Sequence, residues 1–167
     1  MNKKYAGILG VIIVVFVAVL VFFFKPGNDE KLVNNFLHTW FEKSEDNQKI
    51  AALFSQSEDN AVIIGEGVDE ETLETSKKEA EKTTKEFENI YGKYFTDSAF
   101  EKFVGVNYWY VHGIHENSKE CEVKKVDISK DNSVYKFKVT LDVDGSEVKE
   151  EGRIELQDGK ISNLKIY

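Results

Sequence analysis

The clearest pattern along the chain is an unbroken apolar run close to its start. From Ala6 to Phe24, nineteen successive residues carry no charged or polar side chain, which is the length and character of a helix that crosses a bilayer. A cleavable secretory signal has a shorter apolar region followed by small residues, whereas this run ends in three phenylalanines, a lysine and a proline. We therefore expect a retained transmembrane anchor over 6–24.

Charge on the two sides of the run predicts its orientation. Lys3 and Lys4 precede the run, and the chain becomes acidic soon after it. Because positively charged flanks stay in the cytoplasm, we expect residues 1–5 to form a cytoplasmic tail. Residues 25–28 would then be a linker, and residues 29–167 a domain on the outer side of the cell membrane.

Helical periodicity begins directly after the linker. Apolar side chains in two neighbouring i, i+4 rows predict a first helix that buries one face: Leu32, Val33, Phe36, Leu37, Trp40 and Phe41. Asn28 is the expected N-cap of this helix. A second, shorter helix is expected over about 46–54.

A short strand and a long helix are expected next. Residues 61–64 are apolar and are followed by two glycines, which is typical of a short strand. The third helix, from Asp69 to about Tyr94, is charged except along one side, so we expect it to lie across a sheet. Ser98 and Glu101 are spaced as a capping box for one further helical turn.

From Val106 onward the apolar positions repeat every second residue, which predicts strands. Five strands are expected, over 106–115 and 121–128 and around 135–143, 148–156 and 161–166. The pairs Asp144-Gly145 and Asp158-Gly159 are typical of two-residue hairpin turns. The alternation of inward-facing residues breaks in the second and fifth strands, so we expect a β-bulge in each of them.

The expected order is two helices, a short strand, a long helix and a meander of curved antiparallel strands. This order, with the phrase Tyr91-Gly92-Lys93-Tyr94-Phe95-Thr96-Asp97-Ser98-Ala99-Phe100 at the exit of the long helix, resembles the nuclear transport factor 2-like superfamily. The resemblance implies the cone-shaped, cystatin-like α+β fold, whose sheet curls around the long helix. It also implies an opening that different members fill with substrate, peptide, partner or side chains, so function must be argued from the site.

Composition narrows the setting of the domain. The chain has 22 Lys and Arg against 30 Asp and Glu, and three of the lysines precede Asn28, so residues 28–167 carry a net charge of −11. A surface this acidic argues against nucleic acid as a partner. The single cysteine, Cys121, permits no internal disulfide, and only one arginine is present. Both features would suit an exported protein of a Gram-positive bacterium.

An aromatic segment holds most of the candidate binding residues. On a strand, Tyr108, Tyr110 and His112 would share one face and Trp109 would lie on the other. Together with Tyr94 at the end of the third helix, these residues form the candidate ligand- or partner-binding set. A histidine beside two phenols could act as a general acid or base. No acidic residue shares that face, however, so filling of the core is the preferred interpretation.

We expect neither a metal nor a cofactor. His112 and His115 are three residues apart on the expected strand and would point to opposite faces, which makes them a poor metal pair. The chain also lacks a glycine-rich phosphate loop and a Gly-x-Ser-x-Gly motif.

Three functional hypotheses follow. The preferred one is a non-catalytic, membrane-anchored domain that binds a protein or a cell-envelope ligand outside the cell and that could form homo-oligomers. The resemblance suggests the second, a scaffold subunit of a conjugation or type IV secretion-like machine, because such subunits also combine a short tail, one spanning helix and an outer cone. The third is a small-molecule enzyme that uses His112 in the opening of the cone.

Overall fold

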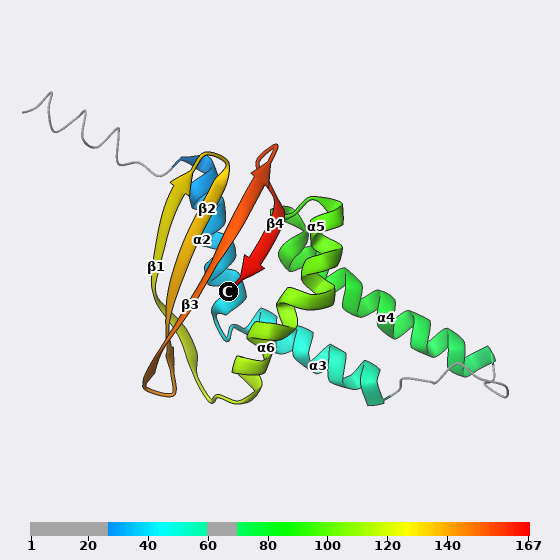
Figure 1. Cartoon of the computed structure of the whole chain (residues 1–167). Coiled ribbons are helices and arrows are strands. Elements are labelled where there is room, and N and C mark those ends of the chain that lie inside the picture. The colour runs from blue at the N-terminus through cyan, green and yellow to red at the C-terminus, as the bar shows by residue number, and fades with distance from the viewer. Residues whose placement is uncertain (1–26, 60–69) are drawn as a thin grey trace, which may run out of the picture.

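The structure is a computed structural model that describes residues 27–59 and 70–167. Helices precede a four-stranded antiparallel sheet, so the chain has an α+β fold (Figure 1). The helical segments are α2 (Asn28–Phe41), α3 (Glu45–Asp59), α4 (Glu70–Tyr91), η1 (Gly92–Tyr94), α5 (Asp97–Lys102), η2 (Phe103–Asn107) and α6 (Tyr108–Glu116). The strands pair in the order in which they occur: β1 (Cys121–Asp131), β2 (Val134–Val143), β3 (Ser146–Gln157) and β4 (Lys160–Ile166).

Several predicted features lie outside the described residues. They are the anchor over 6–24, the short strand over 61–64 and the start of the long helix at Asp69. In the part of the chain that is described, no helix is both long enough and apolar enough to cross a membrane.

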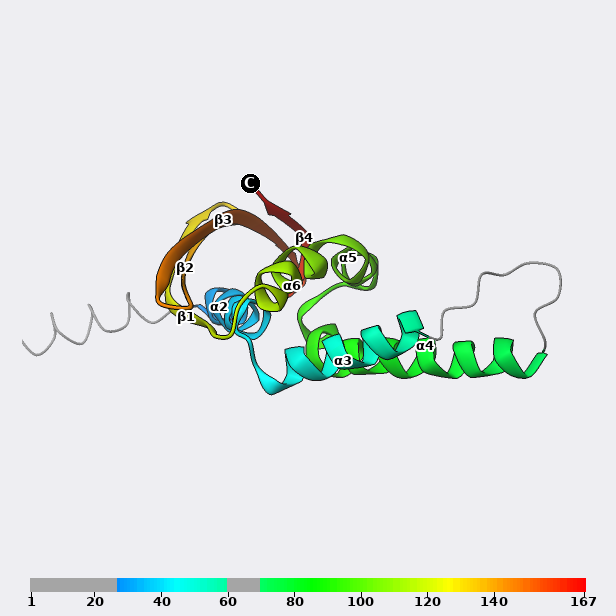
Figure 2. The same cartoon turned by 90° about the horizontal axis from the view of Figure 1, so that it is seen from below.

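The first helix forms where the double apolar row predicts it. Its N-cap is Gly27 rather than Asn28, and its first turn is acidic, as the helix dipole favours. Five of its apolar side chains are completely buried: Val33, Phe36, Leu37, Trp40 and Phe41. The sheet curls over α2 and α6 (Figure 2). Each large apolar side chain buried in this way contributes roughly 1.5–3 kcal/mol to folding.

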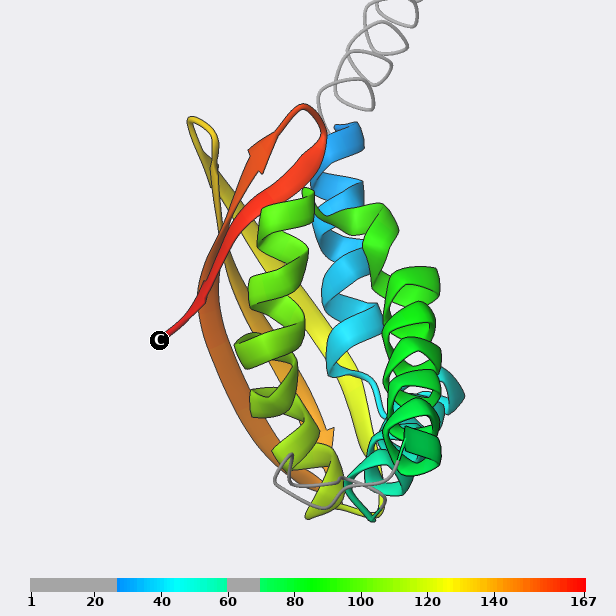
Figure 3. The ribbon, with the colours of Figure 1, turned by 90° about the vertical axis from the view of Figure 1, so that its right-hand side faces the viewer.

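The prediction that the long helix lies across the sheet is wrong. Helices α3 and α4 run side by side and project from the rest of the domain (Figures 2 and 3). Near its C-terminal end, α4 packs against other helices: the Phe87 ring centre lies 4.7 Å from that of Tyr108, and the Tyr91 ring centre lies 4.9 Å from that of Phe103. The sheet therefore curls around α2, and not around the long helix as the resemblance implied.

The strand predicted over 106–115 is also wrong, because residues 106–107 are the end of η2 and residues 108–115 lie in α6. Their β-branched and aromatic side chains favour strands in general, but the buried positions follow a helical spacing with one longer step. The longer step is the interval of five residues between the buried side chains of Phe103 and Tyr108. The π-helical turn η2 lies in this interval and has more residues per turn than an α-helix, so both side chains face the core. Trp109 donates its indole N–H to the Val104 carbonyl of this turn at 2.8 Å.

The predicted capping box after the long helix does not form. Helix α5 begins at Asp97, its N-cap is Thr96, and no side chain makes a capping hydrogen bond there. Ser98 therefore lies inside the first turn, two residues after the N-cap position that the capping box requires.

From residue 121 onward the strands and turns follow the sequence pattern. Both expected bulges are confirmed, since Lys124 is the extra residue in β1 and Ser162 the extra residue in β4. The turn pairs Asp144-Gly145 and Asp158-Gly159 have positive φ at all four residues, as tight hairpins of this type require. Bulges bend a strand and increase its twist, which suits a sheet that curls over a helix.

Candidate functional site

The concave side of the sheet is filled by aromatic side chains. The ring centre of Phe41 in α2 lies 6.5 Å from that of Phe137 in β2, and the ring centre of Trp40 lies 5.4 Å from that of Phe103. All four side chains are at most 3 % exposed. The opening that the resemblance implied is therefore occupied by the protein itself.

A cleft lies between α3 and α6, close to the end of α2 that is far from Asn28. It has a volume of about 290 Å³ and is lined by Lys43, Asn47, Gln48, Ala51, His112, His115 and Glu116. The 14 residues of α2 extend over about 21 Å at the usual rise per residue. A ligand in this cleft would thus lie far from the point at which the chain enters the domain.

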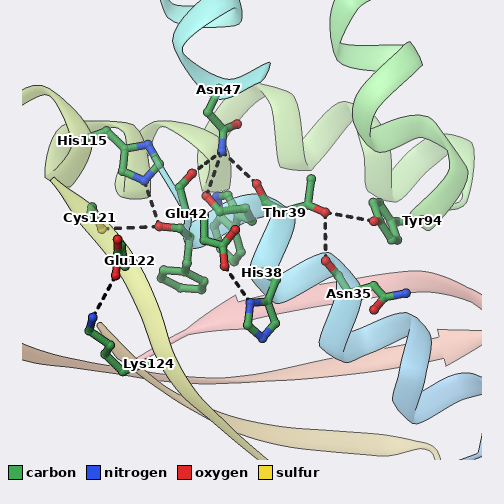
Figure 4. A network of polar contacts seen from close by, with 12 residues as sticks. Asn35, His38, Thr39, Glu42, Asn47, Tyr94, His115, Cys121, Glu122 and Lys124 are labelled. Carbon is green, nitrogen blue, oxygen red and sulfur yellow. Dashed lines mark hydrogen bonds and ion pairs between the residues drawn. The ribbon is translucent and has the colours of Figure 1, made fainter. Parts of the chain in front are cut away.

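Asn47 holds one wall of the cleft in place. Its side-chain amide donates hydrogen bonds to the carbonyls of Thr39 and Glu42, both at 2.8 Å, and its Oδ1 accepts one from the Tyr91 hydroxyl. Figure 4 shows the amide pointing toward the C-terminal end of α2. The carbonyls at a helix C-terminus have no partners within the helix. Asn47, which is only 2 % exposed, supplies those partners and ties α2, α3 and α4 together.

His115 is a buried neutral group at the base of the cleft. It is 6 % exposed, and its Nε2 lies 3.0 Å from the carbonyl oxygen of Phe41 (Figure 4). A carbonyl only accepts, so Nε2 carries the hydrogen and Nδ1 keeps a lone pair. Burial lowers the pKa of His115, although the hydrogen bond to Phe41 opposes this effect. The ring is therefore an uncharged acceptor near neutral pH.

Lys43 fixes the C-terminal end of α6 against α2. Its ammonium donates to the carbonyl oxygen of His115 at 2.7 Å and to that of Ser118. A cation at this end of a helix also interacts favourably with the helix dipole. The positive charge of Lys43 therefore serves the structure of the cleft wall.

His112 has an acidic neighbour, Glu116, which the sequence analysis missed because it assigned these residues to a strand. On α6, Glu116 follows His112 by one turn, and its Oε1 lies 3.4 Å from Nε2 of the imidazole. His112 and His115 line the same cleft, so the prediction that they point to opposite faces is wrong. Among the described residues, no group of three or more His, Cys, Asp or Glu side chains is placed to hold a metal ion.

Tyr108 and Tyr94 lie in the core. Tyr108 is 2 % exposed and its hydroxyl donates to the backbone carbonyl of Asn47 at 3.4 Å. Tyr94 is 7 % exposed, and its hydroxyl lies 3.0 Å from Oγ1 of Thr39 (Figure 4). Neither ring is available to a partner without rearrangement.

Trp109 and Tyr110 lie nearer the surface, on different sides of α6. Trp109 contributes to a second, mainly apolar cleft of about 250 Å³, whose other lining residues are Phe54, Ala80, Thr83, Thr84, Phe87 and Val104. Tyr110 is 49 % exposed and donates its hydroxyl to the Glu150 carboxylate at 2.9 Å. The five candidate residues are thus not brought together in one site. Only His112 joins the cleft between α3 and α6.

No protein-family model matches the sequence, and no curated protein gives a significant match. One solved structure with partial similarity is a de novo designed β-sheet protein determined by solution NMR. It shares 15 % sequence identity over 74 % of this chain and 89 % of its own, with a TM-score of 0.34.

Proposed function

We propose that this chain is a non-catalytic binding module, anchored in the cell membrane by residues 6–24, with residues 29–167 on the outer side. Its ligand is a protein or a component of the cell envelope. The observation that carries the proposal is the filled concave side of the sheet, where Phe41 and Trp40 occupy the space that a deep pocket would need. Binding then takes place at the surface.

Two features of the sequence support the anchor and the orientation. The uncharged run of nineteen residues matches the thickness of a bilayer, and Lys3 and Lys4 before it favour a cytoplasmic N-terminus. With the anchor in place, α2 leads away from the membrane-facing end of the domain. The cleft between α3 and α6 would then face outward, where an external ligand can reach it.

The cleft combines donors and acceptors on a rigid frame. The cleft is lined by the uncharged imidazole of His115 and by Lys43 and Glu116, which bring one charge of each sign to its walls. Asn47 fixes the N-terminal end of α3, which forms one wall, to the C-terminal end of α2. A preformed surface of this kind loses little entropy on binding, as a recognition site requires.

A small-molecule enzyme is the second candidate, and one observation favours it. Glu116 can orient His112, as a carboxylate commonly does for a catalytic imidazole. The side chain of Glu116 is 64 % exposed, however, so water screens the pair. An active site that excludes water would make such a pair far more effective.

Photo-crosslinking from the cleft tests the proposal. Gln48 is exposed at the rim, so a photoreactive amino acid placed there should leave the fold intact. Irradiation of intact cells is expected to give a covalent adduct, because a bound partner would lie within reach of residue 48. The adduct is detected as a discrete heavier band of the tagged chain on a denaturing gel.

The matched control places the same photoreactive group at Ser129, which is exposed on β1. Adducts of equal yield from both positions would mean random collisions and would contradict a site at the cleft. The variant His112→Gln keeps a polar side chain in the lining of the cleft but removes the imidazole that a general base would need. The adduct should therefore persist in this variant. If His112→Gln abolished turnover of a small molecule while the adduct persisted, the catalytic candidate would replace the non-catalytic one.

A further inference from the structure

Among the described residues, β4 is shorter than β3, so residues 146–150 of β3 have no strand partner on the β4 side; these residues are called the free edge. The last residue pair between β3 and β4 is Gly152 with Ile166, after which the Tyr167 N–H donates to the Glu151 carbonyl at 3.0 Å. Among the described residues, no strand pairs with residues 146–150 on that side. Five residues of sheet edge are therefore open at this position.

The alternation of the ladder shows which backbone groups point outward. The Glu151 carbonyl faces Tyr167 on the β4 side, whereas the Leu156 N–H faces Ser133 on the β2 side. Neighbouring residues of a strand direct their N–H and C=O groups to opposite sides. Glu147 and Lys149 therefore present their backbone groups at the free edge, and Val148 directs its own toward β2.

The free edge is complementary to itself. If a second copy of the edge is laid against it in antiparallel fashion about a two-fold axis at Val148, Glu147 faces Lys149 of the second copy, and Lys149 faces Glu147. Val148 then faces Val148, and Ser146 faces Glu150. One oxygen of the Glu150 carboxylate accepts from the Tyr110 hydroxyl of its own chain, and the other can accept from the serine hydroxyl. Within each copy, the Lys149 ammonium already lies 2.6 Å from the Glu147 carboxylate, so the two-fold axis brings two such ion pairs together with their charges alternating. Opposite charges and apolar pairs placed directly across two strands are both favourable.

The same register satisfies the backbone. Glu147 and Lys149 are the residues whose N–H and C=O groups point outward, and in this register they face each other across the axis. They can therefore form the doubly hydrogen-bonded pair of an antiparallel ladder, once on each side of the axis. Centring the axis on Glu147 or on Lys149 would instead place two like charges opposite each other, which is unfavourable.

We propose that residues 146–150 of β3 form an interface between two copies of this chain, joining their sheets by antiparallel pairing about Val148. Tyr167 lies next to Glu151 and limits the shared segment to these five residues. The other edge of the sheet is poorly suited to pairing, because Lys124 forms a bulge in β1 and further charged side chains follow it, which are devices that block edge pairing. The proposal does not depend on the ligand of the cleft.

Disulfide trapping of the full chain in detergent tests the geometry. In the proposed register the two Val148 residues form a pair without mutual hydrogen bonds, with their Cα atoms about 4.5 Å apart, within the range of a disulfide. Val148→Cys is expected to give a covalent dimer under mild oxidation. Ser129→Cys, on the opposite edge, is the control. If Val148→Cys yields no more covalent dimer than Ser129→Cys, the interface is not the one proposed.

Charge reversal tests the register without a new cysteine. Glu147→Lys would place two lysine pairs across the axis, and Lys149→Glu would place two glutamate pairs there. Each change should raise the dimer dissociation constant about tenfold or more. The double variant Glu147→Lys, Lys149→Glu restores both opposite-charge pairs and should regain most of the affinity. The readout is the molar mass of the full chain in detergent, measured by light scattering over a range of concentrations.

The outcomes separate the proposed partner from others. Loss of dimer in both single variants and recovery in the double variant supports pairing of two copies about Val148. A wild-type chain that stays monomeric at every concentration overturns the proposal. A dimer that none of the three variants changes places the contact elsewhere and overturns it as well. The crosslinking test at Gln48 is unaffected by these results, so the two proposals can fail separately.

Discussion

The variant Gly152→Ala is expected to unfold with a free energy about 2 kcal/mol or more below that of the wild type. A Cβ at residue 152 would lie 2.3 Å from the carbonyl oxygen of Lys165 and 2.5 Å from Cζ of Phe137. The Phe137 ring cannot retreat easily, because it is 3 % exposed and packs in the core. Phe137 is also paired with Gly152 in the β2–β3 register, so the aromatic ring covers the glycine. The strands would have to separate to make room for a methyl group.

Gly113→Ala is the matched control for this change. A Cβ at residue 113 would meet no atom within 4 Å, and alanine is favoured over glycine inside a helix by about 1 kcal/mol. This variant should therefore be slightly more stable than the wild type. Urea unfolding of the full chain, followed by circular dichroism, compares the two. If Gly152→Ala is as stable as Gly113→Ala, the close packing of Phe137 over β3 is incorrect.

The second large effect is expected for Asn47→Ala, which should lower the free energy of unfolding by about 3 kcal/mol. The substitution removes three hydrogen bonds: those from the amide to the Thr39 and Glu42 carbonyls, and the one that Asn47 accepts from the Tyr91 hydroxyl. Each lost hydrogen bond contributes about 1 kcal/mol, although the Tyr91 hydroxyl keeps the Thr39 carbonyl as an acceptor at 3.2 Å and the Glu42 carbonyl keeps the Ser44 N–H as a donor. The junction of α2, α3 and α4 would lose its shared contact, and the cleft wall would loosen.

Gln48→Ala provides the comparison for the asparagine variant. Gln48 is the next residue in α3, it is exposed, and its side chain makes one hydrogen bond, to the Lys43 carbonyl at 3.3 Å. Its replacement should change stability by less than about 0.5 kcal/mol. Thermal and urea unfolding of both variants measure the difference. Equal stabilities for the two variants would show that Asn47 does not organise the junction.

The sequence predicts local structure well where one face of an element is buried in a regular pattern. The apolar rows of α2 and the alternation in β2 locate those elements. The breaks in the alternation predict one bulge in each of two strands, and the structure places these bulges at Lys124 and Ser162. These features are readable because burial imposes a fixed period on a regular backbone. A bulge shifts the alternation of apolar and polar residues by one position, and this shift can be recognised in the sequence.

The same reasoning fails where the backbone departs from a regular period. The π-helical turn η2 adds one residue between Phe103 and Tyr108, which interrupts the helical repeat and leaves a run of residues that favour strands. The position of α4 is missed for a different reason. Its apolar side indicates that something covers it, but periodicity does not distinguish a sheet from neighbouring helices.

The candidate site is predicted only in part. His112 is found from its residue type, but its acidic partner Glu116 is four residues away, a spacing that brings side chains together on a helix and not on a strand. Asn47 and Lys43 act on carbonyl groups of distant parts of the chain. Contacts of that kind depend on tertiary packing, and no local pattern in the sequence encodes them.

Labelling of a single cysteine tests most directly whether the domain lies outside the cell. Cys121 is 4 % exposed and burial raises its pKa to about 11, so the wild-type chain serves as an unreactive blank. Ser129→Cys places an accessible thiol on the same strand. A membrane-impermeant maleimide should label this variant in intact cells as fully as after lysis, with the labelled chain in the membrane fraction. Labelling that occurs only after lysis would place the domain inside the cell and contradict the account.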